Sequence, residues 1–135
     1  MLAADTNYCI AQAAERYQVP PALIRAVLAK EGGSLGTVSR NKNGSLDYGP
    51  MQINSTWLPS LSKFGISASH LVWDSCVNIG TGTWILATNY RSYSGDWTKA
   101  IASYNVGRLN SPGRVRVGTL YAYDVIRKWR TLQGL

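Results

Sequence analysis

The sequence predicts a mainly helical α+β fold: one domain of helices with a small β-hairpin after the second helix. Its 135 residues match the usual size of one domain, so we treat 1–135 as a single unit. Most apolar residues recur at helical spacing, in segments separated by turn residues. The stretch 36–54 lacks this period and contains Asn43-Gly44, a strong hairpin-turn signal. We therefore expect strands at about 37–40 and 45–48, and no alternating α/β sheet.

Two helices are expected before the hairpin. The first begins near a capping residue, Thr6 or Asn7, and ends before Pro20-Pro21, because the residue before a proline avoids the helical region. The second runs over 21–31, since proline suits a first helical turn, and Gly32-Gly33 ends it. Residues 1–5 are expected to be a disordered start.

Four more helices are expected after the hairpin. A short one follows Asn54-Ser55, a long one runs from Asp74 or Ser75 to about 93, one follows Asp96, and one closes the chain. Between the last two we expect a basic loop over 106–118 that could contact phosphate or carboxylate groups. The side chains expected on packed helix faces are Val77, Gly80, Trp84 and Ala87 in the long helix and Tyr121, Val125, Trp129 and Leu132 in the last. Gly80 and Gly82 suggest a close packing contact.

The composition points to an anionic partner. Lys and Arg exceed Asp and Glu by 14 to 7, a net charge of +7. Nucleic acid, anionic lipid and an acidic wall polymer all fit such a charge. With 45% hydrophobic and 16% charged residues, intrinsic disorder is excluded. No apolar run approaches the roughly 18 residues of a membrane span.

The two cysteines, Cys9 and Cys76, leave two alternatives open. They are either a disulfide or two buried free thiols, because the count alone does not choose. They lack the spacing of a metal or redox motif, so no metal site or cofactor is expected. The first residues lack a signal-peptide pattern, so the protein is either cytosolic or a mature form from which a signal was removed.

Glu31 is the first candidate catalytic residue. It falls at the end of the apolar stripe of its helix, in line with Leu23 and Val27. Partial burial and the helix C-terminus both favour a protonated carboxyl, which a general acid needs for cleaving a glycosidic bond. The alternative is that Glu31 ends in solvent.

Asp47, in the predicted hairpin, is the second candidate. Across a cleft from Glu31 it would be a nucleophile, a water activator or an ion stabiliser. The alternative is a turn aspartate that binds its own backbone. Amide and phenol groups suited to sugars occur at Tyr48, Gln52, Asn54, Tyr104 and Asn105. Capping and core packing are their commoner uses.

Three segments in order resemble the SLT-type lytic transglycosylases. The helix over 22–31 resembles the one that carries the catalytic acid, Gly49-Pro50-Met51-Gln52 resembles a Gly-Leu-Met-Gln motif, and Ala102-Ser103-Tyr104-Asn105-Val106-Gly107 resembles an Ala-Tyr-Asn-Ala-Gly motif. Cys9 and the stretch 74–79 look most like the small IagB-like enzymes of secretion, conjugation and pilus machines. The hairpin stretch 47–55 also looks like that of animal-type lysozymes, where an aspartate at this position is the second catalytic carboxylate.

The resemblance implies a lysozyme-like fold and a peptidoglycan substrate. It implies that Glu31 acts as acid and then base to leave 1,6-anhydro ends, with Met51, Gln52, Tyr104 and Asn105 in the substrate site. It also implies a Cys9–Cys76 disulfide, a periplasmic or otherwise exported mature form, and recruitment by a secretion, conjugation or pilus apparatus. Gly32 departs from the family's usual Ser, and Pro50 from Leu or Ile.

Two alternatives remain at this point. A muramidase using Glu31 and Asp47 would release reducing ends. A non-catalytic module binding wall glycan or nucleic acid would have no turnover, and nucleic-acid binding would weaken steeply with salt. The presence of a glutamate at the motif position favours an enzyme, so nucleic acid is not the expected partner.

Overall fold

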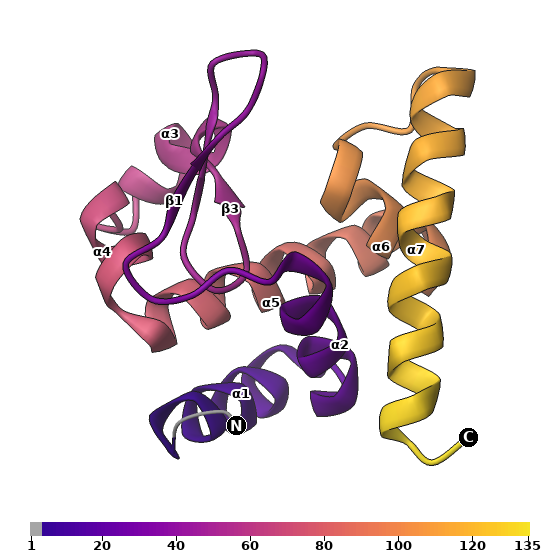
Figure 1. The fold of residues 1–135 in the computed structure, drawn as a ribbon, viewed down its shortest axis with the longest axis horizontal. Helices are drawn as coiled ribbons and strands as arrows, with labels where there is room; N and C mark the ends of the chain where they lie inside the picture. The colour runs from indigo at the N-terminus through magenta and orange to yellow at the C-terminus, as the bar shows by residue number, and fades with distance from the viewer. Residues whose placement is uncertain (1–3) are drawn as a thin grey trace.

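A computed structural model describes residues 4–135 as helices around a small three-stranded sheet, which confirms the predicted fold class (Figure 1). The elements in order are α1 Ala4–Tyr17, α2 Pro21–Glu31, β1 Val38–Arg40, β2 Leu46–Tyr48, β3 Ile53–Asn54, the 3-10 helix η1 Ser55–Trp57, α3 Leu58–Ser62, α4 Ala68–Trp73, α5 Ser75–Ser92, α6 Trp97–Val106 and α7 Pro112–Leu132. Of the expected disordered start, residues 1–3 lie outside the described residues, and Ala4 and Asp5 belong to α1.

The long helix α5 lies at the centre of the fold. The sheet with α3 and α4 stands on one side of it, and α6 and α7 on the other (Figure 1). The predicted packing stripe on this helix is partly right: Ala87 is buried, and Val77 and Trp84 pack half-buried against the core. Because neighbours surround α5, it also buries residues outside that stripe: Asn78, Ile79, Thr81, Gly82, Thr83, Ile85 and Leu86. Of the two predicted glycine contacts, only Gly82 has one: a Cβ there would lie 2.5 Å from the sulfur of Met51.

The sheet is antiparallel in the order β1-β2-β3, and β1 and β2 form the predicted hairpin around Asn43-Gly44. The strand β3 was not predicted, because two residues give no periodic signal. It pairs with β2 so that Asn54 lies opposite Asp47 of the hairpin.

Fully buried Asn78 of α5 attaches the sheet to the helices. Its amide nitrogen donates to the carbonyls of Tyr48 and Leu71 at 2.8 Å, and its oxygen accepts the Met51 N–H at 2.9 Å. Buried backbone groups must find partners, so one side chain satisfies three groups that the loops leave free. This arrangement fixes the turn at residues 49–52.

A disulfide joins Cys9 of α1 to Cys76 in the first turn of α5, which decides between the two alternatives for the cysteines. In the chain-entropy account, closing a loop with a sequence separation of 67 contributes about 4 kcal/mol. Among the described residues, no helix is both long and apolar enough to cross a membrane.

The predicted basic loop over 106–118 is wrong in its second half. The helix α7 starts at Pro112, and the hydroxyl of Ser111 caps it by accepting the Arg114 N–H at 3.2 Å. Gly113 and Gly118 concealed this helix in the sequence. Gly118 lets α7 pack closely on α6, since a Cβ there would lie 3.1 Å from the Cβ of Ala102.

Two further differences concern helix starts. The helix α1 begins at Ala4 rather than after Thr6 or Asn7, and Asn7 instead accepts a hydrogen bond from Arg25 at 3.0 Å. The short helix α4 was not predicted. Its capping residues are Ser67 and His70, a pair that places histidine where a capping box usually has Glu or Gln.

Candidate active site

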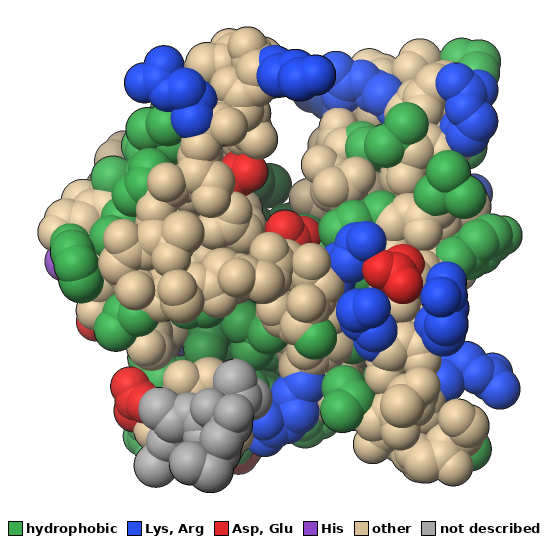
Figure 2. Space-filling model, viewed as in Figure 1, with side chains coloured by type: hydrophobic (Ala, Val, Ile, Leu, Met, Phe, Trp, Pro, Cys, Tyr) green, Lys and Arg blue, Asp and Glu red, His purple; other side chains and the backbone are tan. Residues whose placement is uncertain are grey.

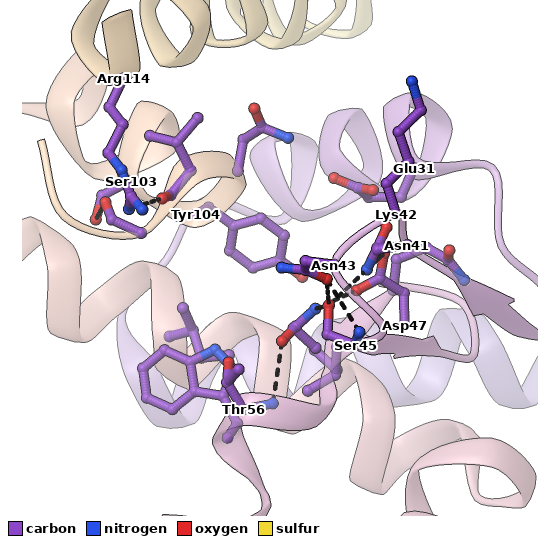
Figure 3. A pocket seen from close by; sticks show the side chains of 18 residues that line it. Glu31, Asn41, Lys42, Asn43, Ser45, Asp47, Thr56, Ser103, Tyr104 and Arg114 are labelled. Atoms are coloured by element: carbon purple, nitrogen blue, oxygen red, sulfur yellow. Dashed lines mark hydrogen bonds between the residues drawn. The ribbon is translucent and has the colours of Figure 1, made fainter. Parts of the chain in front are cut away.

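A cleft of about 670 Å³ separates the sheet from α6 and α7 (Figure 2). Residues of the hairpin, β3 and η1 form one wall, and residues of α6 with the start of α7 form the other. Figure 3 shows Arg114 and Ser103 on one side, Asp47 with the hairpin on the other, and Tyr104 between them. Six of the residues singled out in the sequence line this cleft: Glu31, Asp47, Gln52, Asn54, Tyr104 and Asn105.

Glu31 is the last residue of α2 and reaches the cleft half-buried. Gly32 ends the helix in the left-handed region, with φ 68°, and its N–H binds the Leu28 carbonyl. Desolvation raises the pKa of the Glu31 carboxyl, and the charge of Asp47 raises it further. A hydrogen bond from Tyr121 and the charge of Lys30 oppose this rise without cancelling it. The Glu31 carboxyl therefore holds its proton to a higher pH than a free glutamate does.

Tyr121 of α7 is a site residue that the sequence did not reveal. Its hydroxyl donates a hydrogen bond to Oε2 of Glu31. Desolvation and the charge of Glu31 raise the pKa of this phenol far above its ordinary value, so it stays a donor. Because Tyr121 donates to Oε2, the other carboxyl oxygen, Oε1, is the one left to carry a proton.

An ion pair supports this contact from behind. Lys30 lies 2.7 Å from the carboxylate of Asp124, and its ammonium lies 5.7 Å from the centre of the Tyr121 ring. The hydrogen bond from Lys30 lowers the pKa of Asp124, which keeps it charged. The pair joins the end of α2 to the middle of α7 and so keeps Tyr121 beside Glu31.

Asp47 is held differently from Glu31. Asn54 donates to its Oδ1 at 2.9 Å and Asn41 donates to its Oδ2 at 3.1 Å. The same two amides also donate to the hydroxyl of Ser45 at 3.0 Å. Asp47 therefore sits in a polar network within the hairpin wall, with an amide donor on each oxygen.

Two segments meet backbone to backbone next to Glu31. A Cβ on Gly33 would lie only 2.1 Å from the carbonyl oxygen of Gly49, so no larger residue fits there. Gln52 has a positive φ of 54°, a conformation that costs free energy in a residue other than glycine. Both its N–H and its side-chain amide bind the Gly49 carbonyl, at 3.1 and 2.9 Å, and this compensates.

Tyr104 crosses from α6 to the same turn. Its hydroxyl donates to the carbonyl of Met51 at 2.7 Å, and desolvation raises its pKa well above the ordinary value. Tyr48 and Met51 are buried, at 6% and 0% exposure, and do not line the cleft. They lie beneath it, where they support the turn that carries Gln52.

The sequence missed most of the cleft walls. The polar members not singled out as site residues are Asn41, Lys42, Asn43 and Ser45 of the hairpin, Thr56 of η1 and Ser103 of α6. Arg114 belongs to the basic segment 106–118 that was expected to contact phosphate or carboxylate groups. Asn43-Gly44 marked the turn but not the direction of its side chains. Within residues 4–135, no group of three or more His, Cys, Asp or Glu residues is placed to hold a metal ion.

The chain is similar to known proteins over most of its length. The family profile described as Transglycosylase SLT domain matches residues 8–118. The chain is 33% identical to Invasion protein IagB of Salmonella typhimurium, over 94% of this chain and 78% of that protein. It is 34% identical to Protein IpgF of Shigella flexneri, over 90% and 78%, and 31% identical to X polypeptide of Escherichia coli K12, over 88% and 70%.

Proposed function

Because this chain belongs to the family of transglycosylase SLT domains, which implies glycan-cleaving transglycosylase activity, we propose that it is a peptidoglycan lytic transglycosylase. Its reaction would cleave the β-1,4 bond between N-acetylmuramic acid and N-acetylglucosamine. The observation that carries the proposal is Glu31 at the cleft, where desolvation raises the pKa of its carboxyl and Tyr121 donates a hydrogen bond to its Oε2. A general acid must keep its proton near neutral pH, and this environment supports that.

In the first half of the reaction, Glu31 protonates the glycosidic oxygen and the bond from that oxygen to C1 of the muramic residue breaks. The carbonyl oxygen of the muramic acetamido group stabilises the positive charge at C1. Substrate assistance of this kind removes the need for a protein nucleophile. It suits Asp47, whose two oxygens already accept amide hydrogen bonds.

In the second half, the ionised Glu31 takes the proton of the C6 hydroxyl of the same sugar. The C6 oxygen bonds to C1, and the product carries a 1,6-anhydro ring. Glu31 returns to its protonated form, so no water is consumed. Tyr121 stays hydrogen-bonded to one carboxyl oxygen throughout and keeps the other aimed at the sugar.

The sugar is positioned by side chains of both walls. Gln52 and Asn54 come from the sheet, and Tyr104 and Asn105 from α6. Rigid placement lowers the barrier by several kcal/mol when the reacting atoms are already aligned. The buried Met51 and Tyr48 act indirectly, by holding the turn from below.

A muramidase is the second candidate, because Asp47 lines the same cleft as Glu31 and its charge raises the pKa of Glu31. In that reaction water would accept the muramic residue, and Asp47 would act as nucleophile or water activator. The two candidates differ in their products: one leaves anhydro ends and the other leaves reducing ends.

Mass spectrometry of purified peptidoglycan digested with the protein tests the proposal. Anhydro products from the native protein, and none from Glu31→Gln, are expected. Reducing ends without anhydro products would overturn it in favour of the muramidase.

The setting we propose is the periplasm or another exported compartment, where the protein opens the wall locally for a secretion, conjugation or pilus machine. The disulfide supports export, because such bonds persist in oxidising compartments. The relative named as an invasion protein supports a link to such machinery. Fractionation of cells that express the tagged protein checks this: cytoplasmic recovery with reduced cysteines would contradict it.

A further inference from the structure

Arg114 presents a fixed guanidinium group to the cleft. It belongs to the first turn of α7, and its Nη1 donates to the carbonyl of Val106, the last residue of α6, at 3.0 Å. A cation is favourable at a helix C-terminus, where carbonyl groups point outward. The loop between the two helices is also tied down, since the hydroxyl of Ser103 donates to the Gly107 carbonyl at 2.7 Å.

The donors of Arg114 are mostly unused. A guanidinium carries five N–H groups, and only one of its bonds to protein is seen here. Across residues 4–135, every ion pair centres on Asp124, with Lys30, Arg127 and Lys128. Arg114 therefore lines the cleft without a carboxylate partner in the described chain.

Lys42 faces Arg114 from the other wall. It lies in the hairpin turn between β1 and β2, lines the same cleft, and is likewise outside the ion pairs of the described residues. Figure 3 shows Lys42 and Arg114 on opposite sides of the pocket, and Figure 2 shows basic side chains of the two walls approaching each other at one end of the cleft. The hairpin turn and the start of α7 lie at that end, away from α2 (Figure 1).

We propose that Arg114, together with Lys42, binds a free carboxylate of the peptide stem attached to the muramic residue. This proposal rests on the proposed function and names the part of the substrate that the basic end of the cleft recognises. Neutral sugar hydroxyls need no cation, whereas a planar guanidinium matches a carboxylate with two parallel hydrogen bonds. In intact wall the lactyl carboxyl is consumed in the amide bond to the peptide, so the free carboxylates are those of the stem.

The test measures binding in a Glu31→Gln background, so that it does not depend on turnover. Three ligands are compared by calorimetry: soluble stem-bearing glycan fragments, the same fragments with their carboxylates converted to neutral amides by carbodiimide coupling, and strands stripped of stems by an amidase. Arg114→Gln and Lys42→Gln are set beside Arg116→Gln. Arg116 is the matched control, because it is exposed on the same helix and does not line the cleft.

Arg114→Gln is expected to weaken binding of stem-bearing fragments about tenfold, the value of one charge-assisted contact, and Lys42→Gln by a smaller factor. On amidated fragments and on stripped strands these variants should bind as the control does. In the active background, Arg114→Gln should raise KM on stem-bearing glycan and leave kcat within about twofold.

Three outcomes would overturn the proposal. If Arg114→Gln binds stem-bearing fragments as tightly as Arg116→Gln does, Arg114 does not bind a carboxylate of the stem. A loss that persists on amidated fragments would show a steric or structural role. If Arg114→Gln also binds stripped strands more weakly than the control does, Arg114 contacts the lactyl carboxylate that these strands expose, and not the stem. Failure of the proposed function itself is recognised separately, by the absence of anhydro products from the native protein on all three substrates.

Discussion

The cleft contains two carboxyl groups whose surroundings differ in kind. Glu31 ends a helix, is desolvated, and receives one hydrogen bond from the neutral phenol of Tyr121. Asp47 lies in a sheet wall and receives amide hydrogen bonds on both oxygens. Desolvation raises the pKa of Glu31, and the negative charge of Asp47 raises it further. Two acids of similar intrinsic strength thus have different surroundings, and the predictions below test whether they also have different tasks.

The largest effect is expected for Glu31→Gln. The amide keeps the shape of the side chain and still accepts from Tyr121, but it has no acidic proton to give. General acid catalysis typically contributes 10²–10⁴, so we expect wall-clearing activity to fall by about a thousandfold. Near-UV circular dichroism should remain that of the native protein. A variant that retains a tenth of the activity would show that Glu31 is not the acid.

Asn78→Ala is expected to destabilise the sheet wall of the cleft more than the wall formed by the helices. It leaves the Met51 N–H and the carbonyls of Tyr48 and Leu71 without partners in the core. We expect the free energy of unfolding to fall by about 3 kcal/mol, measured by urea titration. Hydrogen exchange should increase in the sheet and the 49–52 turn rather than in α2 and α7. Equal loss of protection on both sides would contradict that expectation.

Tyr121→Phe removes the donor from Glu31 and keeps the ring. Its hydrogen bond lowers the pKa of Glu31, so its loss should raise that pKa. Because the reaction needs protonated Glu31, the alkaline limb of the pH–activity profile should move to higher pH. The rate at the optimum should fall about tenfold as the carboxyl loses its orientation. An alkaline limb that moves to lower pH would reverse the assigned role.

Asp47→Asn should have the smallest effect. The charge of Asp47 raises the pKa of Glu31, so its removal should lower that pKa and move the alkaline limb to lower pH. We expect a loss of only a few-fold at the optimum, with anhydro products retained, because an electrostatic neighbour is removed and not a reacting group. A loss as large as that of Glu31→Gln would instead favour the muramidase, and product analysis would confirm it.

The sequence was most informative where the signal is local. The helix over 21–31 and its end at Gly32 follow from proline, glycine and apolar spacing, and the caps Asp74 and Asp96 are where their residue types predicted. Glu31 was singled out by its place on that helix. The sequence could not supply what depends on distant neighbours. Tyr121 contacts Glu31 across 90 positions and looks like one more member of an apolar stripe.

The walls of the cleft illustrate the same limit. Arg114 was expected in a loop, because two glycines masked the helix that carries it. The extent of burial of α5 was underestimated, because nothing in its own period shows that neighbours surround it. Asp47 was placed in the hairpin, but its partner Asn54 reaches it only because β3 pairs with β2.

The contact at Gly33 has a consequence for how such a protein diversifies. Main-chain atoms of Gly33 and Gly49 approach each other there, so any side chain at position 33 would push the end of α2 away from the turn with Gln52. Residues along the rim can be exchanged over generations, and substrate preference can drift with them, while the chemical step keeps its alignment. An engineer who wishes to retarget the enzyme would randomise the rim and leave that one glycine untouched.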